Sequence, residues 1–415
     1  MQYDIIIIGS GIAGLYSAYK IKKFNPALSV LILEKNKKEW IGGRTSNEQF
    51  YGSQVVTGAG IGRKNKDYLL VDLLKELKIP NHEFVSNHSY ITEFQPININ
   101  ETMRMLKKEY KKDITNKVMT FKDFAIKYLG TKKYKQFVIT SGYSDYDKED
   151  VHDTLYNYGM DDNAEKLIGL SISWKDLVAK LVQKIGSENI KAKQNVIKIN
   201  DHDSKSQDCI FEVETKKGAI YKCKKIIIAT TVSSLLNLLP SKSSIYKQIH
   251  AQPFLRLYAK FSKSSTKIMK QYIKSYTSVE GPLQKIIPVD ADKGIYMIAY
   301  SDNASAISLK DHLENTVENR SYFEELLEQA LGIEDDESLK INALLDFYWT
   351  EGTHYYEPLK GPYKNRTEFI NAAQHPDKNI LVVGEVVSQH QGWVEGALES
   401  VVTVLNKKWL TNKTC

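Results

Sequence analysis

Two apolar segments near the N-terminus enclose a glycine-rich turn, and this arrangement constrains the fold more than any other feature. Residues 3–9 (YDIIIIG) and 28–34 (LSVLILE) are continuous apolar runs, and residues 12–23 between them have helical periodicity. Runs that do not alternate are typical of parallel strands that helices cover on both faces. The sequence therefore predicts a strand, a helix and a second parallel strand in an α/β fold.

The turn between the first strand and the helix is a GxGxxG motif made of Gly9, Ser10, Gly11, Ile12, Ala13 and Gly14. In this context the first glycine allows a tight turn, the second lets the backbone approach a pyrophosphate, and the third allows close helix packing. Glu34 follows Gly14 by twenty residues and can accept hydrogen bonds from ribose hydroxyls. The motif predicts a Rossmann-like dinucleotide site. The carboxylate disfavours NADP but does not separate NAD from FAD.

The strands of this sheet are scattered over the whole chain. Two further apolar runs lie at residues 224–230 and 378–385, and an apolar helical stripe follows the second run. We therefore expect a discontinuous dinucleotide-binding domain made of residues 1–65, 188–242 and 375–415. The two intervening stretches, 66–187 and 243–374, mix helical and strand-like patterns and are predicted to form an inserted α+β substrate domain.

Composition excludes several classes of protein. The 415 residues are 42% hydrophobic and 26% charged, which is a globular balance. No apolar run is long enough to span a membrane, and no signal peptide is visible. The three cysteines, Cys209, Cys223 and Cys415, have neither disulfide-framework nor metal-site spacing, and no histidine cluster indicates a metal. We expect an intracellular protein without bound metal.

The net charge of +7 is concentrated in one segment, residues 102–136, which holds ten lysines and one arginine against three acids. An anionic partner such as nucleic acid or a membrane surface is one interpretation. Solvated helix faces are the other, and we favour it.

A second glycine segment, Gly42-Gly43-Arg44, follows Glu34 by about ten residues. Here the sequence resembles the flavin-containing amine oxidase superfamily, whose members carry such a segment after the second strand. The resemblance implies FAD as the cofactor. It also implies that the glycines run flush against the dinucleotide and that the guanidinium of Arg44 neutralises pyrophosphate charge.

Two more segments match the family in outline. Residues 57–63 (TGAGIGR) are similar to a stretch that passes near the flavin ring, although Gly60 replaces the usual aromatic residue. Val196, in a predicted strand, resembles a valine that contacts the adenine. The resemblance adds further cofactor contacts at Lys35, Gly58, Ala59, Gly60, Ile61, Val196 and Ala229.

The C-terminal segment 382–402 (VVGEVVSQHQGWVEGALESVV) matches the family most specifically. The resemblance implies that Gly384 and Glu385 contact the ribityl chain. It places the start of the following helix, with Trp393, Val394 and Ala397, under the isoalloxazine. A helix N-terminus there would stabilise negative charge on a reduced flavin.

The resemblance also implies an aromatic substrate cage, formed by Trp393 and either Tyr355 or Tyr356; a buried structural role for each is the alternative. Arg256, in the run PFLRLYAKF, stands where the family has a lysine near flavin N5. This departure implies that the site tolerates arginine, that a lysine comes from elsewhere, or that turnover is weak. No counterpart of a flavin-tethering cysteine is present, so FAD should be non-covalent.

The resemblance covers about half of the chain. It implies an FAD-dependent amine oxidase that passes a hydride from the α carbon of a small amine to flavin N5, with reoxidation by O2 to hydrogen peroxide. Two alternatives remain open. One is an oxidase or desaturase acting on carbon-carbon bonds, and the other is an FAD-bearing interaction protein with little turnover.

Overall fold

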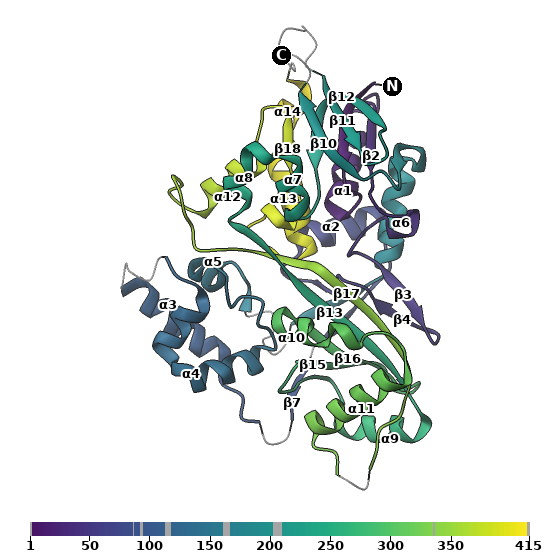
Figure 1. Ribbon diagram of the computed structural model, residues 1–415, viewed down its shortest axis with the longest axis vertical. Helices are drawn as coiled ribbons and strands as arrows, with labels where there is room; N and C mark the ends of the chain where they lie inside the picture. Colours follow the sequence, from purple (N-terminus) through teal and green to yellow (C-terminus); the bar gives the residue numbers. More distant parts are fainter. Residues whose placement is uncertain are drawn as a thin grey trace.

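The computed structural model describes residues 2–85, 87–91, 94–112, 118–160, 167–201, 210–334 and 337–412. The molecule is elongated, with one β-sheet toward each end of its long axis (Figure 1). Cys209 and Cys415 lie outside the described residues, as do the acidic positions 161–162 and part of the basic segment.

The first sheet joins the two ends of the chain. Its strand order is β10-β11-β12-β1-β2-β9, and β18 also pairs with β12. β1 runs parallel to both β2 and β12, and β18 runs parallel to β12. The predicted scattered parallel sheet is therefore confirmed, with an antiparallel extension at β10 and β11. The strands are β1 (Gln2–Ile8), β2 (Val30–Leu33), β9 (Ile190–Lys191), β10 (Val196–Asp201), β11 (Phe211–Thr215), β12 (Ile220–Ile228) and β18 (Ile380–Val382).

Helices cover both faces of this sheet, as the continuous apolar runs require. One buried core lies under α1 (Ile12–Phe24), α2 (Tyr68–Leu77), α6 (Trp174–Ile185) and α13 (Val394–Val404). The other lies under α7 (Val232–Leu238), α8 (Ser243–Tyr246) and α12 (Arg366–Gln374). Helices α2, α6, α8 and α12 come from stretches that the sequence assigned to the substrate domain. Their apolar faces pack on the dinucleotide sheet, so that assignment is corrected for these four helices.

The second sheet is mostly antiparallel, with the order β17-β13-β16-β15-β14-β7. Its strands are β13 (Ile249–Phe261), β14 (Tyr276–Ser278), β15 (Lys285–Asp290), β16 (Ile295–Asp302), β17 (Ile341–Tyr356) and β7 (His88–Tyr90). A third core lies between this sheet and the helices α9 (Lys263–Tyr272), α10 (Asn303–Leu309) and α11 (Val317–Leu331). The long strands β13 and β17 begin and end in different cores and so connect the two halves (Figure 1).

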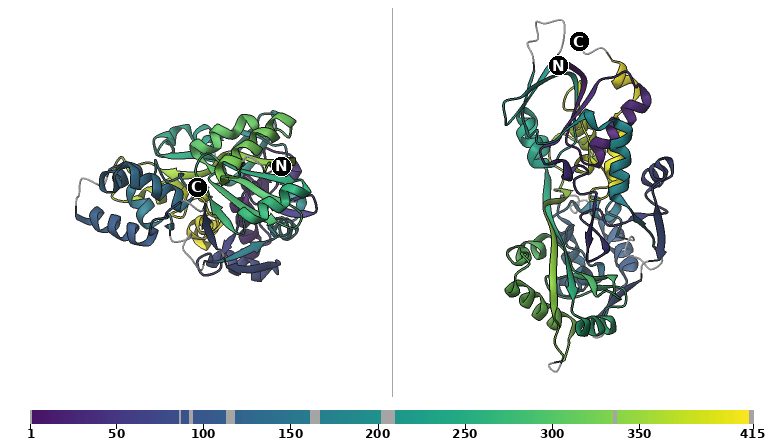
Figure 2. Two further views of the ribbon diagram at one scale, coloured as in Figure 1. Left: turned by 90° about the horizontal axis from the view of Figure 1, so that it is seen from below. Right: turned by 90° about the vertical axis from the view of Figure 1, so that its right-hand side faces the viewer.

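A helical unit with its own aromatic core flanks the second sheet and consists of α3 (Ile99–Lys112), α4 (Phe121–Ser141) and α5 (Val151–Tyr156). The left view of Figure 2 shows it beside the sheet. The smaller elements are β3 (Asn47–Phe50), β4 (Ser53–Val56), β5 (Gly62–Arg63), β6 (Asn81–Val85), β8 (Ile168–Ile172), α14 (Lys407–Thr411) and the short 3-10 helices η1 (Lys38–Trp40), η4 (Ser187–Asn189), η5 (Pro240–Lys242), η6 (Lys310–His312) and η7 (Glu385–Val387).

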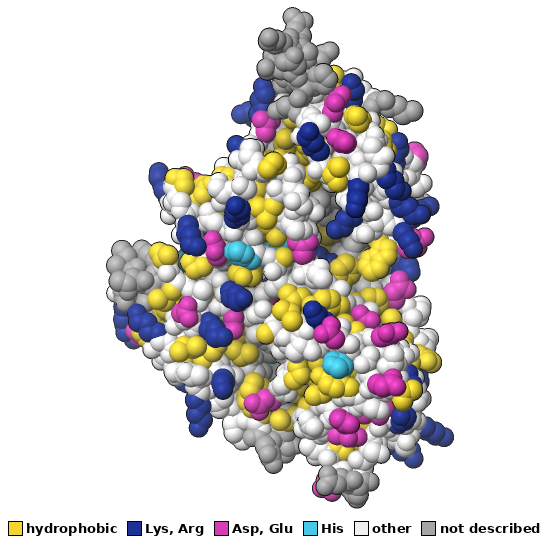
Figure 3. All heavy atoms as spheres, in the orientation of Figure 1, with side chains coloured by type: hydrophobic (Ala, Val, Ile, Leu, Met, Phe, Trp, Pro, Cys, Tyr) yellow, Lys and Arg dark blue, Asp and Glu magenta, His cyan; other side chains and the backbone are white. Residues whose placement is uncertain are grey.

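Within the described ranges no helix combines the length and the apolarity needed to cross a membrane. The basic residues of α3 and α4 lie on the surface, and Figure 3 shows further basic side chains over the other half of the same face. Basic side chains are therefore spread over this face, and the described part of the segment 102–136 does not form a separate basic patch on it.

Candidate functional site

The GxGxxG turn is built from three glycines with different surroundings. Gly9 has φ +102°, and a Cβ there would lie 2.3 Å from the carbonyl oxygen of Ala229. A Cβ on Gly14 would lie 2.1 Å from the carbonyl oxygen of Gly9. A Cβ on Gly11 would meet nothing within 4 Å. The first and third glycines thus serve packing, whereas the second faces open space at the N-terminus of α1.

The start of α1 is suited to an anion. Gly11 is the N-cap residue, and no side chain caps the free N–H groups of the first turn. These donors and the helix dipole favour a phosphate group. Ile12 and Ala13 are buried beneath the turn and belong to the core. The open space at Gly11 therefore fits a dinucleotide pyrophosphate.

Gly42 and Gly43 form the second wall of this cradle. Gly42 forms a parallel bridge with Gly11, and its N–H donates to the carbonyl oxygen of Ser10 at 3.0 Å. Both glycines have positive φ, +100° and +59°, which other residues rarely adopt. A Cβ on Gly43 would approach the Cα of Gly11 to 3.9 Å, so the two glycine segments lie side by side.

Glu34 is fixed at the end of β2 with only 6% of its surface exposed. Its carboxylate accepts hydrogen bonds from Ser10 N (3.0 Å), Ser10 Oγ (2.6 Å) and Asn36 N (2.8 Å). Its carbonyl oxygen accepts from Gln194 N, which brings the start of β10, with Val196, to the same end of the cradle. Lys35 is exposed. A fixed carboxylate at this position suits a ribose.

Glu385 is a buried charge that joins three parts of the chain. Arg44 Nη1 donates to Glu385 Oε1 at 2.9 Å, and the same nitrogen donates to the carbonyl oxygen of Gly352 at 2.5 Å. His354 Nδ1 lies 2.5 Å from Glu385 Oε1, and Gly392 N donates to Oε2 at 3.0 Å. Burial alone would raise the pKa of Glu385, but His354 and Arg44 outweigh it and hold this pKa well below its usual range.

The tautomer of His354 follows from its neighbours. Val232 N donates to His354 Nε2 at 3.2 Å, so the ring proton is on Nδ1, where it is donated to Glu385. The sequence pattern indicated only an isolated histidine at this position. Its role as a partner of Glu385 arises because β17 passes over η7.

The segment 57–63 lies between two arginines. Ala59 N donates to the carbonyl oxygen of Arg44 at 2.7 Å, and Arg256 Nε donates to the carbonyl oxygen of Gly58 at 2.7 Å. A Cβ on Gly60 would come within 3.0 Å of Arg256 Nη2, so any larger side chain there would displace the guanidinium. Arg256 on β13 is 4% exposed, and Ile61 is partly buried.

Trp393 is the N-cap residue of α13, and its ring stacks on the guanidinium of Arg63, 3.7 Å from the ring centroid. Arg63 is buried and paired with Asp67 at 2.6 Å. Ala397 is buried and Val394 is partly buried in the core under this helix. Gly384 has φ +123°, and its N–H donates to Ser400 Oγ at 2.8 Å, which fixes the turn before η7.

Tyr355 and Tyr356 are consecutive on β17 and therefore point to opposite faces. Tyr356 is 2% exposed, its hydroxyl donates to the carbonyl oxygen of Ser388, and its ring packs on Phe369. Its expected place in a substrate cage is corrected to a core position. Tyr355 instead lines a pocket next to the cradle.

This pocket, which we call the acidic pocket, carries an excess of hydrogen-bond acceptors. Its lining residues are Asp145, Glu149, Asn157, Tyr158, Gln252, Thr353, His354, Tyr355, Gln389, Gln391 and Gly392. Gln391 Oε1 is buried and has no hydrogen-bond partner among the described residues. Burial raises the pKa of Asp145 to about 7, and it also raises the pKa of Glu149. His354 and Gly392 contact Glu385, so the acidic pocket adjoins the cradle.

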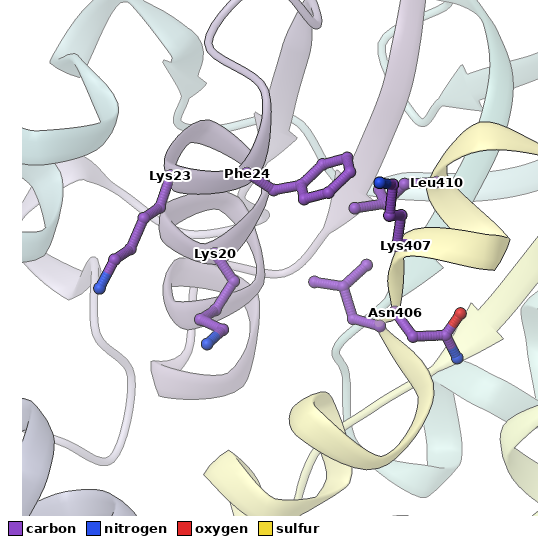
Figure 4. A pocket seen from close by; sticks show the side chains of 7 residues that line it. Lys20, Lys23, Phe24, Asn406, Lys407 and Leu410 are labelled. Carbon is purple, nitrogen blue, oxygen red and sulfur yellow. The ribbon is translucent and has the colours of Figure 1, made fainter.

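A second hollow lies on the outer surface between α1 and α14 (Figure 4). Its lining includes Lys20, Lys23 and Lys407 around the exposed ring of Phe24. It contains none of the residues of the cradle or the acidic pocket. Within the described ranges no group of His, Cys, Asp and Glu side chains is arranged to hold a metal ion.

Two family models match the chain. Residues 7–77 match the NAD(P)-binding Rossmann-like domain, and residues 105–403 match the flavin containing amine oxidoreductase family. A shorter match is to an uncharacterized protein of Acanthamoeba polyphaga mimivirus, which is 30% identical over 81 residues. That match covers 19% of this chain, and this chain spans only 16% of the relative's length.

Solved structures of putrescine oxidase share the fold. The wild-type enzyme bound to putrescine aligns with a TM-score of 0.74 at 14% identity and covers 97% of both chains. A double variant aligns with a TM-score of 0.73, also over 97% of both chains, and a triple variant with 0.72 over 96% of this chain and 97% of its own. At this identity the likeness concerns the fold.

Proposed function

The chain belongs to the flavin containing amine oxidoreductase family, an FAD-dependent class of oxidoreductase, and on this premise we propose that it oxidises a small amine whose amino group enters the acidic pocket, a cavity of about 20 Å³. FAD, when bound, would supply an electron-accepting ring that takes a hydride from the α carbon of the amine at N5 and returns the electrons to O2 as hydrogen peroxide. The residues of this chain would bind, orient and desolvate the two reactants.

The cradle has donors and acceptors for each part of the dinucleotide. Glu34 would accept hydrogen bonds from the ribose, and the free N–H groups at the start of α1 would hold the pyrophosphate. Nη1 of Arg44 is committed to Glu385 and Gly352, which leaves its other guanidinium donors for the cofactor. Glu385, kept ionised by these neighbours, would accept from the ribityl hydroxyls.

We expect FAD to be held without a covalent bond. Cys223, the cysteine within the described residues, lies in β12 and is fully buried. Burial raises the pKa of its thiol to about 12, so it is neither exposed nor ionised enough to attack a cofactor.

The acceptor-rich lining of the acidic pocket carries the proposal of an amine substrate. Asp145 accepts one hydrogen bond from Tyr158, Glu149 accepts one from Thr154, and Gln391 Oε1 has no partner among the described residues, whereas an amine or ammonium group brings two or three donors. A substrate of carbon-carbon oxidation would leave Gln391 Oε1 buried without a partner, at a cost of about 1–3 kcal/mol. The ring of Tyr355, stacked on His250, offers an apolar wall for the carbon chain.

The direct test is anaerobic mixing of the purified holoprotein with a panel of monoamines, diamines and polyamines. We expect at least one amine to bleach the absorption band of the oxidised flavin at about 450 nm. Glu34→Gln should lower FAD content, whereas the matched variant Glu39→Gln, at an exposed position, should not. Bound flavin that no amine bleaches would contradict amine oxidation and favour carbon-carbon oxidation or a non-catalytic role.

A further inference from the structure

Lys285, the first residue of β15, is completely buried, and its Nζ has no hydrogen-bond partner among the described residues. The ammonium position lies 3.4 Å from the ring centroid of Tyr143 and 4.0 Å from that of Tyr300. A buried amine without hydrogen bonds costs free energy, and structures keep such groups mainly where they have a task. The mechanism above does not use Lys285.

Three neighbouring strands of the second sheet bring Lys285 toward Arg256. Arg256 on β13 pairs directly with Tyr300 on β16, and its guanidinium lies 4.2 Å from the ring centroid of Tyr300. The Tyr300 ring therefore contacts both an arginine and a lysine. Burial lowers the pKa of Lys285 to about 7; the positive charge of Arg256 adds to this effect, while Asp302 and Asp145 oppose it.

Hydrogen bonds to Asp302 connect the residues that precede Lys285 and Asp145 in the chain. Ser144 Oγ donates to Asp302 Oδ1 at 2.6 Å, and Gln284 Nε2 donates to the same oxygen at 3.1 Å. Ser144 precedes Asp145 in the chain, and Gln284 precedes Lys285. Asp302 thus holds the lysine strand and the pocket loop together. The titratable and charged groups around Lys285 are Asp145, Asp302, Arg256, Tyr143, Tyr276, Tyr300 and His88.

Asp145 is the member of this group that reaches the substrate. It lines the acidic pocket, and it accepts a hydrogen bond from the hydroxyl of Tyr158. Burial and Asp302 raise its pKa, whereas Tyr158 and Lys285 lower it. Lys285 is thus one of the groups that influence how readily this carboxylate takes a proton, after burial, Asp302 and Tyr158.

Amine oxidation creates a need for such a group. An alkylamine enters from water as an ammonium ion, and its nitrogen must regain a lone pair before the α carbon can release a hydride. We propose that Asp145 is the catalytic base that accepts this proton and that Lys285 is a positioning residue whose positive charge favours the ionised form of Asp145. An N–H bond of the ammonium breaks, an O–H bond forms on Asp145, and no electrons are transferred. This inference rests on the proposed function.

The first test is the pH profile of flavin reduction at saturating amine. The rate constant should rise with pH through an acid limb near pH 7. Lys285→Met removes the charge that lowers the pKa of Asp145, so the limb should move about one pH unit or more to higher pH. Lys285→Arg keeps a charge and should not move the limb upward. The matched variant Tyr276→Phe, in the same buried cluster, should leave the limb in place.

Asp145→Asn should abolish the limb and lower the plateau at least about 100-fold, the usual contribution of a general base. A limb that stays in place in Lys285→Met, or a rate lowered equally at every pH, would overturn the role of Lys285. A normal pH profile in Asp145→Asn would overturn the role of Asp145.

The second test needs no turnover. tert-Butylamine has no hydrogen on its α carbon, so it can bind but cannot be oxidised. At pH 8 its binding to the holoprotein should produce the infrared band of a protonated carboxyl group, and Asp145→Asn should lack this band. Flavin reduction by amines without the band would overturn only this inference. Absence of flavin reduction by any amine would overturn the proposed function itself.

Discussion

The two sheets contribute to the site in different ways. The parallel sheet presents mainly backbone: the N–H groups at the start of α1 and two glycine turns, together with two buried carboxylates, Glu34 and Glu385. The antiparallel sheet presents side chains, since Arg256, Lys285 and Asp302 are all buried on its strands. A diphosphate can be recognised by backbone donors common to many folds, whereas handling a proton at neutral pH requires charged side chains whose burial tunes their pKa.

Glu385→Gln should have the largest effect on the parallel half. It leaves the buried His354 Nδ1–H and Arg44 without a charged partner, and removing one member of a buried ion pair costs about 3–5 kcal/mol. Because the pKa of Glu385 is lowered in the fold, its stabilisation is present above the ordinary glutamate pKa and lost as pH falls below it. Thermal unfolding from pH 3 to 7 should therefore show a flatter acid limb in the variant. An acid limb as steep as that of the native protein would show that the charge of Glu385 does not contribute to stability.

Gly14→Ala should destabilise the same half by about 3 kcal/mol, because the new Cβ would overlap the carbonyl oxygen of Gly9. Gly11→Ala is the matched control, since its Cβ meets no protein atom. For Gly11→Ala we expect normal stability in the absence of cofactor, measured by denaturant unfolding. We also expect a higher Kd for FAD, measured by flavin fluorescence. Equal losses of stability in both variants would contradict a backbone-built cradle.

Lys285→Met tests the antiparallel half through stability. The folded-state pKa of about 7 lies below the ordinary lysine value, so the unfolded chain binds more protons between about pH 7 and 10.5. Stability of the native protein should therefore rise with pH over this window, by at most about 1.4 kcal/mol per pH unit. The variant should lack this rise and be the more stable of the two at pH 7. Parallel curves for both proteins would show that Lys285 titrates normally.

Tyr356→Phe and Tyr355→Phe should have the smallest effects, and they differ in kind. Tyr356→Phe loses the hydrogen bond to Ser388 and should cost about 1 kcal/mol of stability, with KM unchanged. Tyr355→Phe should leave the unfolding midpoint unchanged and alter KM for the amine, because this ring lines the acidic pocket. The reverse pattern would exchange the roles of the two tyrosines.

The sequence predicts the parallel half well because its signals are local. Gly9, Gly11, Gly14 and Glu34 lie within one strand-helix-strand unit, and their spacing alone sets their geometry. The apolar runs at residues 224–230 and 378–385 likewise predicted β12 and β18. The domain boundaries were less accurate, since α2, α6 and α12 have apolar stripes that could pack on either sheet, and only the tertiary structure decides between them.

The antiparallel half carries no comparable signal. Asp145 and Lys285 are 140 residues apart in the chain and meet through Asp302 and the register of β15 and β16. Nothing in the sequence distinguishes Lys285 from the many surface lysines. Tyr355 and Tyr356 show the same limit at short range, because alternation predicts that they diverge but not which of them faces the pocket.

The strands β13 and β17 have a mechanical consequence. Their ladder runs from Ile249 and Tyr356, in one core, to Phe261 and Ile341, in the other. Hinge bending between the two ends of the molecule would have to deform this ladder, so the ladder resists a clamshell opening of the two halves. The helical unit is tied to the same ladder, because Asp150 N donates to the carbonyl oxygen of Tyr356 on β17 and Asp153 on α5 pairs with Arg366 on α12.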